Sequence, residues 1–237
     1  MTKQVTTIAL FCLLAGSAPV CADDYEDALG ATRRGDFAGA FKLLKPLAEK
    51  GDARAQADIG AMYLTGKGTA ANPKDAVKWL RLAADHGNAS AQFNLGTMYL
   101  EGRFVMRDYR EAMKWNLLAA DHGLAAAQVN IASMYYDGVG VAQDYKEAAR
   151  WLRLAAEQGD ADAQLNLCNM YVAGQGVERD LLRGYMWTQL ATETIAMGET
   201  EKKSVRDMSA KTLSPAELAR AQAMVAKCRQ SQFKNCD

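Results

Sequence analysis

The chain has 237 residues, of which 49% are hydrophobic and 24% are charged. Its 28 basic and 28 acidic residues cancel, so the chain lacks the net positive charge with which nucleic-acid-binding proteins hold phosphates. Only 4 prolines interrupt a composition rich in good helix formers. We therefore expect a helical protein that does not bind nucleic acid.

Residues 1–22 have the pattern of a secretory signal peptide. Lys3 supplies a positive start, a short apolar run follows, and the small residues Val20 and Ala22 suit cleavage before Asp23. The apolar run is well short of the roughly 20 residues that span a bilayer, so an uncleaved membrane anchor is the less favoured alternative. We expect the mature chain to start at Asp23, to have no transmembrane segment, and to be periplasmic or secreted.

Export to an oxidising compartment would make disulfides possible. Cys228 and Cys236 lie close together near the C-terminus and are candidates for such a bond. Cys168 stands apart from them in a column of small residues within the repeat described next. We interpret Cys168 as a buried structural thiol.

One motif recurs four times along the chain. It begins with an Ala-Gln pair and continues to a Met-Tyr pair, and its Gln, Met, Tyr and Trp columns each recur every 36 residues. Self-similarity at a fixed period of this length is typical of repeat proteins. We divide the mature chain into a shortened first repeat, four full repeats and a C-terminal tail: 23–51, 52–87, 88–123, 124–159, 160–195 and 196–237.

Each full repeat is predicted to contain two helices. In repeat one the first helix spans about residues 53–64, because apolar residues recur there at helical spacing. A glycine follows the first helix in every copy, and a polar N-cap residue then begins the second. The N-cap residues are Asn72, Asp108, Asp144 and Asp180. Glu111 and Glu147 follow their caps by three residues, which predicts capping boxes in two copies.

A single pair of such helices has too little apolar surface to fold alone, so the pairs must stack. We predict an all-α fold, a right-handed α-solenoid of stacked antiparallel helix pairs. Ile195 replaces a glycine at the end of repeat four, so the last helix is expected to continue toward Gly198. Two tail helices are expected to cap the array, and Ser214 and Glu217 predict a capping box at the second.

The repeat unit resembles that of the Sel-like repeat (SLR) family, a relative of the tetratricopeptide repeat. The shared pattern over residues 52–195 is A-x-x-x-L-G-x-M-Y-x-x-G-x-G-V, then D-x-x-x-A-x-x-W-x-x-x-A-A-x-x-G. The resemblance implies a non-catalytic adaptor that binds a protein or peptide, often in the bacterial envelope. In repeat two, Phe104 replaces a loop glycine and Asn116 replaces a leucine, which indicates either a modified surface or drift.

By this resemblance, the first helix of each repeat lines a concave groove, and its inward residues are the candidates for partner binding. The candidates are Arg54, Asp58, Asn94, Thr97, Asn130, Ser133, Asn166 and Asn169, and the same stripe includes Glu101, Asp137 and Asp162. Asn94, Asn130 and Asn166 form a ladder whose amides could bind an extended peptide. They could equally satisfy groups of the adjacent repeat, and the sequence leaves both interpretations open.

No pattern in the chain indicates a catalytic, metal or cofactor site. His86 and His122 lie one repeat apart, too few and too distant to share a metal, and the glycine-rich loop at Gly66 follows a helix rather than a strand. Ser231 and Lys234 satisfy S-x-x-K, but the motifs that complete such a site are missing. We predict a monomeric protein that is not an enzyme. The alternatives are an envelope enzyme acting on β-lactams or peptidoglycan, and self-assembly through the solenoid ends.

Overall fold

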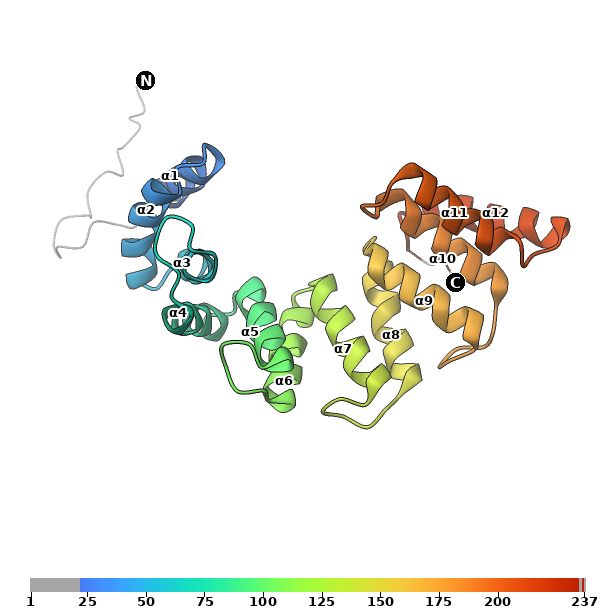
Figure 1. Cartoon of the computed structure of the whole chain (residues 1–237), viewed down its shortest axis with the longest axis horizontal. Coiled ribbons are helices and arrows are strands. Elements are labelled where there is room, and N and C mark those ends of the chain that lie inside the picture. The colour runs from blue at the N-terminus through green and yellow to red at the C-terminus, as the bar shows by residue number, and fades with distance from the viewer. Residues whose placement is uncertain (1–21, 235, 237) are drawn as a thin grey trace, which may run out of the picture.

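The computed structural model describes residues 22–234 and 236, which form α-helices joined by turns and loops, without a strand (Figure 1). The helices are α1 (Ala22–Arg33), α2 (Phe37–Glu49), α3 (Ala53–Thr65), α4 (Pro73–Asp85), α5 (Ala89–Glu101), α6 (Tyr109–Asp121), α7 (Ala125–Asp137), α8 (Tyr145–Ala156), α9 (Ala161–Ala173), α10 (Leu181–Thr194), α11 (Glu199–Ala210) and α12 (Pro215–Gln230). Except for Ala22, the predicted signal peptide lies outside the described residues and stays a prediction. None of the helices described is both long and apolar enough to cross a membrane.

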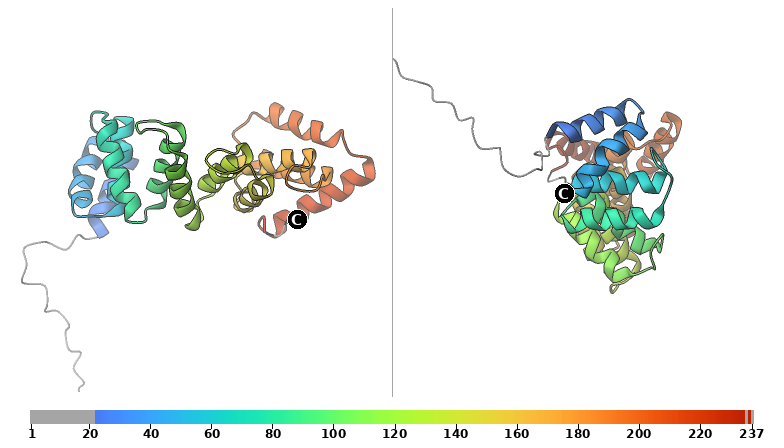
Figure 2. Two further views of the ribbon diagram at one scale, coloured as in Figure 1. Left: turned by 90° about the horizontal axis from the view of Figure 1, so that it is seen from below. Right: turned by 90° about the vertical axis from the view of Figure 1, so that its left-hand side faces the viewer.

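The helices pair in sequence order and stack into an arc, which confirms the solenoid prediction. Contacts run mainly between helices that follow one another along the chain, and α5 also contacts α7 of the next repeat. In Figure 1, α3, α5 and α7 lie on the inner side of the arc, whereas α4 and α6 lie on its outer side. Figure 2 shows the first helices and the last helices at opposite ends of the row. The first helix of each repeat therefore supplies the inner surface.

The second helices begin at the predicted N-cap residues, but the predicted capping boxes are wrong. The Asp108 side chain accepts hydrogen bonds from backbone N–H groups of the first turn, as expected. Its own backbone N–H already donates to the Tyr99 carbonyl (3.0 Å), so that donor is not available to Glu111. The Glu111 carboxylate accepts instead from Trp115 Nε1 (2.8 Å), and Glu147 pairs with an arginine one turn along α8.

The two helices of a repeat approach closely because the first helix carries a small residue at the contact. A Cβ atom on Gly60 would lie 2.7 Å from Leu80 Cγ, which is too close for a side chain. In repeat four, Cys168 and Thr188 occupy the equivalent positions, and Cys168 Sγ lies 3.1 Å from Thr188 Oγ1. Burial raises the pKa of the Cys168 thiol. Cys168 is thus a buried, packed thiol.

Helix α12 covers the apolar flank of the last repeat. Its residues Ala221 and Val225 are buried in the same core cluster as Trp187 of α10. The predicted capping box at the start of α12 is present, with Ser214 and Glu217 bonded reciprocally. The array therefore ends in a helix that shields its core from water.

Helix α10 ends before the glycine to which it was expected to continue. Its last residue is Thr194, and Ile195 has an extended backbone, so the prediction of a helix running toward Gly198 is wrong. A β-branched residue can leave a helix through extended φ and ψ angles, without the left-handed turn that favours glycine. Helix α11 then begins at Glu199 and contacts α10 without burying any residue fully.

Candidate partner-binding site

At the N-terminal end of the inner face, two predicted site residues hold α1 in place. Tyr25 on α1 donates its hydroxyl to Asp58 Oδ2 (2.8 Å), and the Arg54 guanidinium lies 4.2 Å from the centre of the Tyr25 ring. Arg54 also forms an ion pair with Asp52 (2.8 Å). Burial raises the pKa of Asp58, although the Tyr25 hydrogen bond opposes this rise. Arg54 and Asp58 are thus engaged within the molecule.

In the middle of the array, Asn130 joins three helices. Its amide nitrogen donates to Thr97 Oγ1 on α5 (3.2 Å) and to Asn116 Oδ1 on α6 (3.1 Å). Asn116 is fully buried, and its own amide nitrogen donates to the Ala112 carbonyl (2.8 Å). At this ladder position the asparagine therefore satisfies a buried group of the adjacent repeat. Asn116, which in repeat two replaces the leucine of repeats one and three, is therefore part of a hydrogen-bond network.

Farther along the inner face, Ser133, Asn166 and Asn169 are exposed and share one pocket between α7 and α9. Its volume is about 220 Å³. The lining residues are Val129, Ala132, Ser133, Tyr136, Asp137, Leu152, Asn166, Asn169 and Met170. Four of these are aliphatic or methionine, and polar atoms lie beside them. An apolar surface with a few convergent polar groups is the usual form of a binding pocket.

Seven of the eight predicted residues thus fall into three groups, and Asn94 stands apart from them. Ser133, Asn166 and Asn169 come together at the pocket, whereas Thr97 and Asn130 belong to the buried network. Arg54 and Asp58 hold α1, and Asn94 is half-buried at the first ladder position. The apolar pocket residues were missed, because apolar residues at helical spacing are equally typical of the core.

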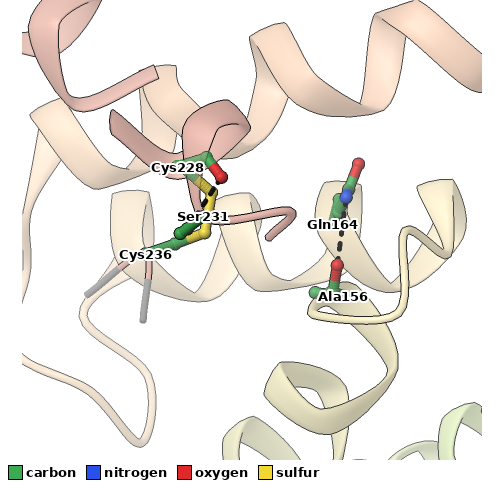
Figure 3. Close-up of a disulfide and its surroundings, with 5 residues drawn as sticks. All are labelled: Ala156, Gln164, Cys228, Ser231 and Cys236. Carbon is green, nitrogen blue, oxygen red and sulfur yellow. Dashed lines mark hydrogen bonds between the residues drawn. A yellow bond between two sulfur atoms is a disulfide. The ribbon is translucent and has the colours of Figure 1, made fainter. Parts of the chain in front are cut away.

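The recurring glutamine column joins successive repeats. Gln56 Nε2 donates to the Ala48 carbonyl at the end of the preceding repeat (3.0 Å), and Gln164 makes the same bond to Ala156 (3.1 Å; Figure 3). His86 Nδ1 lies 3.1 Å from Gln56 Oε1, so this histidine supports the same contact. The column is buried and structural in this chain.

The S-x-x-K motif lies in the turn that follows α12. Cys228 and Cys236 form a disulfide around this turn (Figure 3). The Ser231 hydroxyl donates to the Cys228 carbonyl (2.9 Å), and the Lys234 side chain is exposed. A hydroxyl that donates to a carbonyl in this way closes the turn, and a nucleophile would need a base as its hydrogen-bond acceptor.

A protein-family model matches this chain in segments whose bounds lie close to those of the predicted repeats. The family model of the Sel1 repeat matches residues 22–52, 53–88, 89–124, 125–160 and 161–193. The chain belongs to the Sel1 repeat family. Sel1 repeats are protein–protein interaction modules, and proteins built from them are generally non-catalytic scaffolds. The resemblance to Sel-like repeat proteins found in the sequence is thereby confirmed.

Two solved Sel1 repeat structures are similar over most of this chain. One is a protective antigen present in uropathogenic Escherichia coli strains, 29% identical with a TM-score of 0.72. The match covers 89% of this chain and 46% of the antigen, so this chain spans less than half of the antigen's length. The other is a Sel1 repeat protein from Oxalobacter formigenes, 29% identical with a TM-score of 0.72. That match covers 87% of this chain and 83% of the Oxalobacter protein. No curated protein matches the chain.

Proposed function

We propose that this protein is an exported, non-catalytic binding module that holds a partner protein in its concave groove. Membership of the Sel1 repeat family supports a protein partner. The observation that carries the groove assignment is the pocket between α7 and α9, where Ser133, Asn166 and Asn169 are exposed beside an apolar floor. Burial of the apolar floor would stabilise the complex, and the polar groups would orient the bound segment.

The chemistry of the exposed amides fits an extended segment of a partner. Asn166 and Asn169 lie three residues apart on α9, so their side chains are neighbours on one helix face. Each amide offers a donor and an acceptor, which are the groups that an extended backbone presents in return. A peptide lying across α7 and α9 would therefore bond through its backbone and place a side chain in the pocket.

Two features support export. Residues 1–22 have the features of a signal peptide, and the disulfide between Cys228 and Cys236 suits an oxidising compartment. We assign the protein to the periplasm or the cell exterior, as an adaptor or regulator of the envelope. In a bacterial host with an outer membrane, N-terminal sequencing of the periplasmic fraction should yield a chain that starts at Asp23. A chain found only in the cytoplasm with residues 1–22 intact would contradict the assignment.

The groove assignment is tested by blocking the pocket without disturbing the fold. The double variant Asn166→Arg, Asn169→Arg places two long charged side chains at exposed positions. Gln222→Arg, at an exposed position on α12, is the matched control. We expect chemical crosslinking and mass spectrometry to recover the same partner with the natural protein and the control, and to lose it with the double variant. Equal recovery from all three proteins would overturn the groove assignment.

Asn130 is a poor site for this test, although it belongs to the same ladder. A bulky charged residue there would also break the hydrogen bond to the buried Asn116, so lost binding could reflect lost structure. The non-catalytic assignment has its own test. Covalent labelling by a fluorescent penicillin, lost in Ser231→Ala, would contradict it; we expect no labelling.

A further inference from the structure

We propose that the pocket between α7 and α9 takes a basic side chain, arginine or lysine, from an extended segment of the partner. The inference rests on the proposed function and specifies its partner chemistry. It depends on the charge of the inner helices, on the lining of the pocket and on its position along α7.

The inner helices in the middle of the array carry negative charge only. Helices α5, α7 and α9 contain no lysine or arginine, and each carries one carboxylate: Glu101, Asp137 and Asp162. The outer helices α4, α6 and α8 carry two or three basic residues and one or two carboxylates each, so α4 and α8 are net positive and α6 is balanced. This separation of charge gives the groove a negative potential, which attracts a cationic segment.

The pocket is arranged for a long side chain with a positive end. Its volume of about 220 Å³ exceeds the ~150 Å³ of a cavity that holds benzene, so one long side chain fits. Val129, Leu152 and Met170 line it with apolar groups that suit the methylene stem of arginine or lysine. Among the described residues that line it, Asp137 alone is charged.

The backbone of α7 adds to the effect of Asp137. Asp137 is the last residue of α7, where the helix dipole places partial negative charge, and cations are stabilised there. A second pocket on the inner face has a different charge environment. It lies against α1 and contains both Asp58 and Lys67, and Asp58 already accepts a hydrogen bond from Tyr25.

The test uses short blocked peptides as probes of the purified protein. Titrations of ¹⁵N-labelled protein with acetyl-Ala-Arg-Ala-amide and acetyl-Ala-Lys-Ala-amide are compared with those using the leucine and glutamate peptides of the same form. At least one basic peptide should shift the amide signals of Ser133, Asp137, Asn166 and Asn169 in a saturable way, and the glutamate peptide should not. Binding should weaken as salt is raised, because the attraction is screened.

Asp137→Asn removes the charge and keeps the shape of the side chain. It should weaken binding of the basic peptide by about threefold to tenfold, as expected for an exposed to partly desolvated charge pair. Asp121→Asn is the matched control, since Asp121 is also exposed and is also the last residue of its helix, on the outer α6. It should leave binding unchanged.

Several results would overturn the inference. These are equal shifts with the leucine peptide, shifts that lie away from the pocket, an Asp137→Asn variant that binds as tightly as the natural protein, and no shift with any peptide. None of these results would overturn the groove assignment, which the crosslinking experiment tests separately. Partner recovery with the Asn166→Arg, Asn169→Arg variant does not depend on which side chain enters the pocket.

Discussion

Replacing Asn130 by alanine should destabilise the array far more than the same change elsewhere in the asparagine ladder. The substitution leaves Asn116 Oδ1, which belongs to a fully buried side chain, without the donor that lies 3.1 Å away. An unsatisfied buried polar group costs about 1–3 kcal/mol. Thr97 is half-buried and can bond to water instead, so it adds little. We expect a loss of about 2 kcal/mol in the free energy of unfolding.

The second half of the experiment removes the buried amide itself. Repeats one and three have Leu80 and Leu152 at the position of Asn116, and both leucines are buried. In an Asn116→Leu background, Asn130→Ala should therefore lower the free energy of unfolding by less than about 0.5 kcal/mol. The leucine has no buried oxygen that could lose its hydrogen-bond donor. The coupling energy of the cycle is then about 1.5 kcal/mol, within the range for side chains in one hydrogen-bond network.

Urea unfolding followed by circular dichroism at 222 nm measures all four proteins of the cycle. Asn166→Ala is the matched control, because Asn166 occupies the same ladder position in the next repeat and is exposed; it should change the free energy by less than about 0.5 kcal/mol. The structural role of Asn130 would be refuted if Asn130→Ala cost no more than Asn166→Ala. An undiminished cost in the Asn116→Leu background would refute it as well.

Three further outcomes follow from other parts of the chain. Gly176→Ala, where φ is +69° and a Cβ would lie 2.0 Å from a backbone oxygen, should cost about 2–5 kcal/mol, whereas Gly87→Ala, with φ +82° and open space, should cost only about 1–2; equal urea midpoints would contradict this. Burial and a hydrogen bond raise the pKa of Tyr25, so its stabilising effect is complete below pH about 10 and is lost above it. The difference in Tm between the natural protein and Tyr25→Phe should accordingly be constant up to pH about 9.5 and shrink steadily as the pH is raised past about 10, and a constant difference above pH about 10 would count against it. Reduction of the disulfide between Cys228 and Cys236, which closes a loop of 8 residues, should lower the stability of the α12 cap by about 2–3 kcal/mol, and an unchanged urea transition after reduction would disprove this.

The features that the sequence predicted well depend on interactions between near neighbours. The first helix of repeat one was expected over about 53–64 and spans Ala53–Thr65, and the N-cap residue of every second helix was predicted correctly. An N-cap bond reaches only two or three residues along the chain, and the period of 36 is visible in the residues themselves. The capping boxes predicted for Glu111 and Glu147 failed because the N–H groups of Asp108 and Asp144 each donate to a carbonyl nine residues earlier, on the preceding helix.

The sequence by itself determined the repeat and the helical fold, since both follow from periodicity and local helix signals. The resemblance to Sel-like repeat proteins implied which helices face the groove. Only the tertiary structure decided what the inward residues do: Asn130 reaches a partner 14 residues away and Tyr25 one 33 residues away. Residues at the same repeat position, such as Asn130 and Asn166, are alike in sequence but meet different neighbours. Whether such a side chain faces a ligand or a buried group depends on those neighbours, because a buried polar group without a partner is too costly to leave unsatisfied.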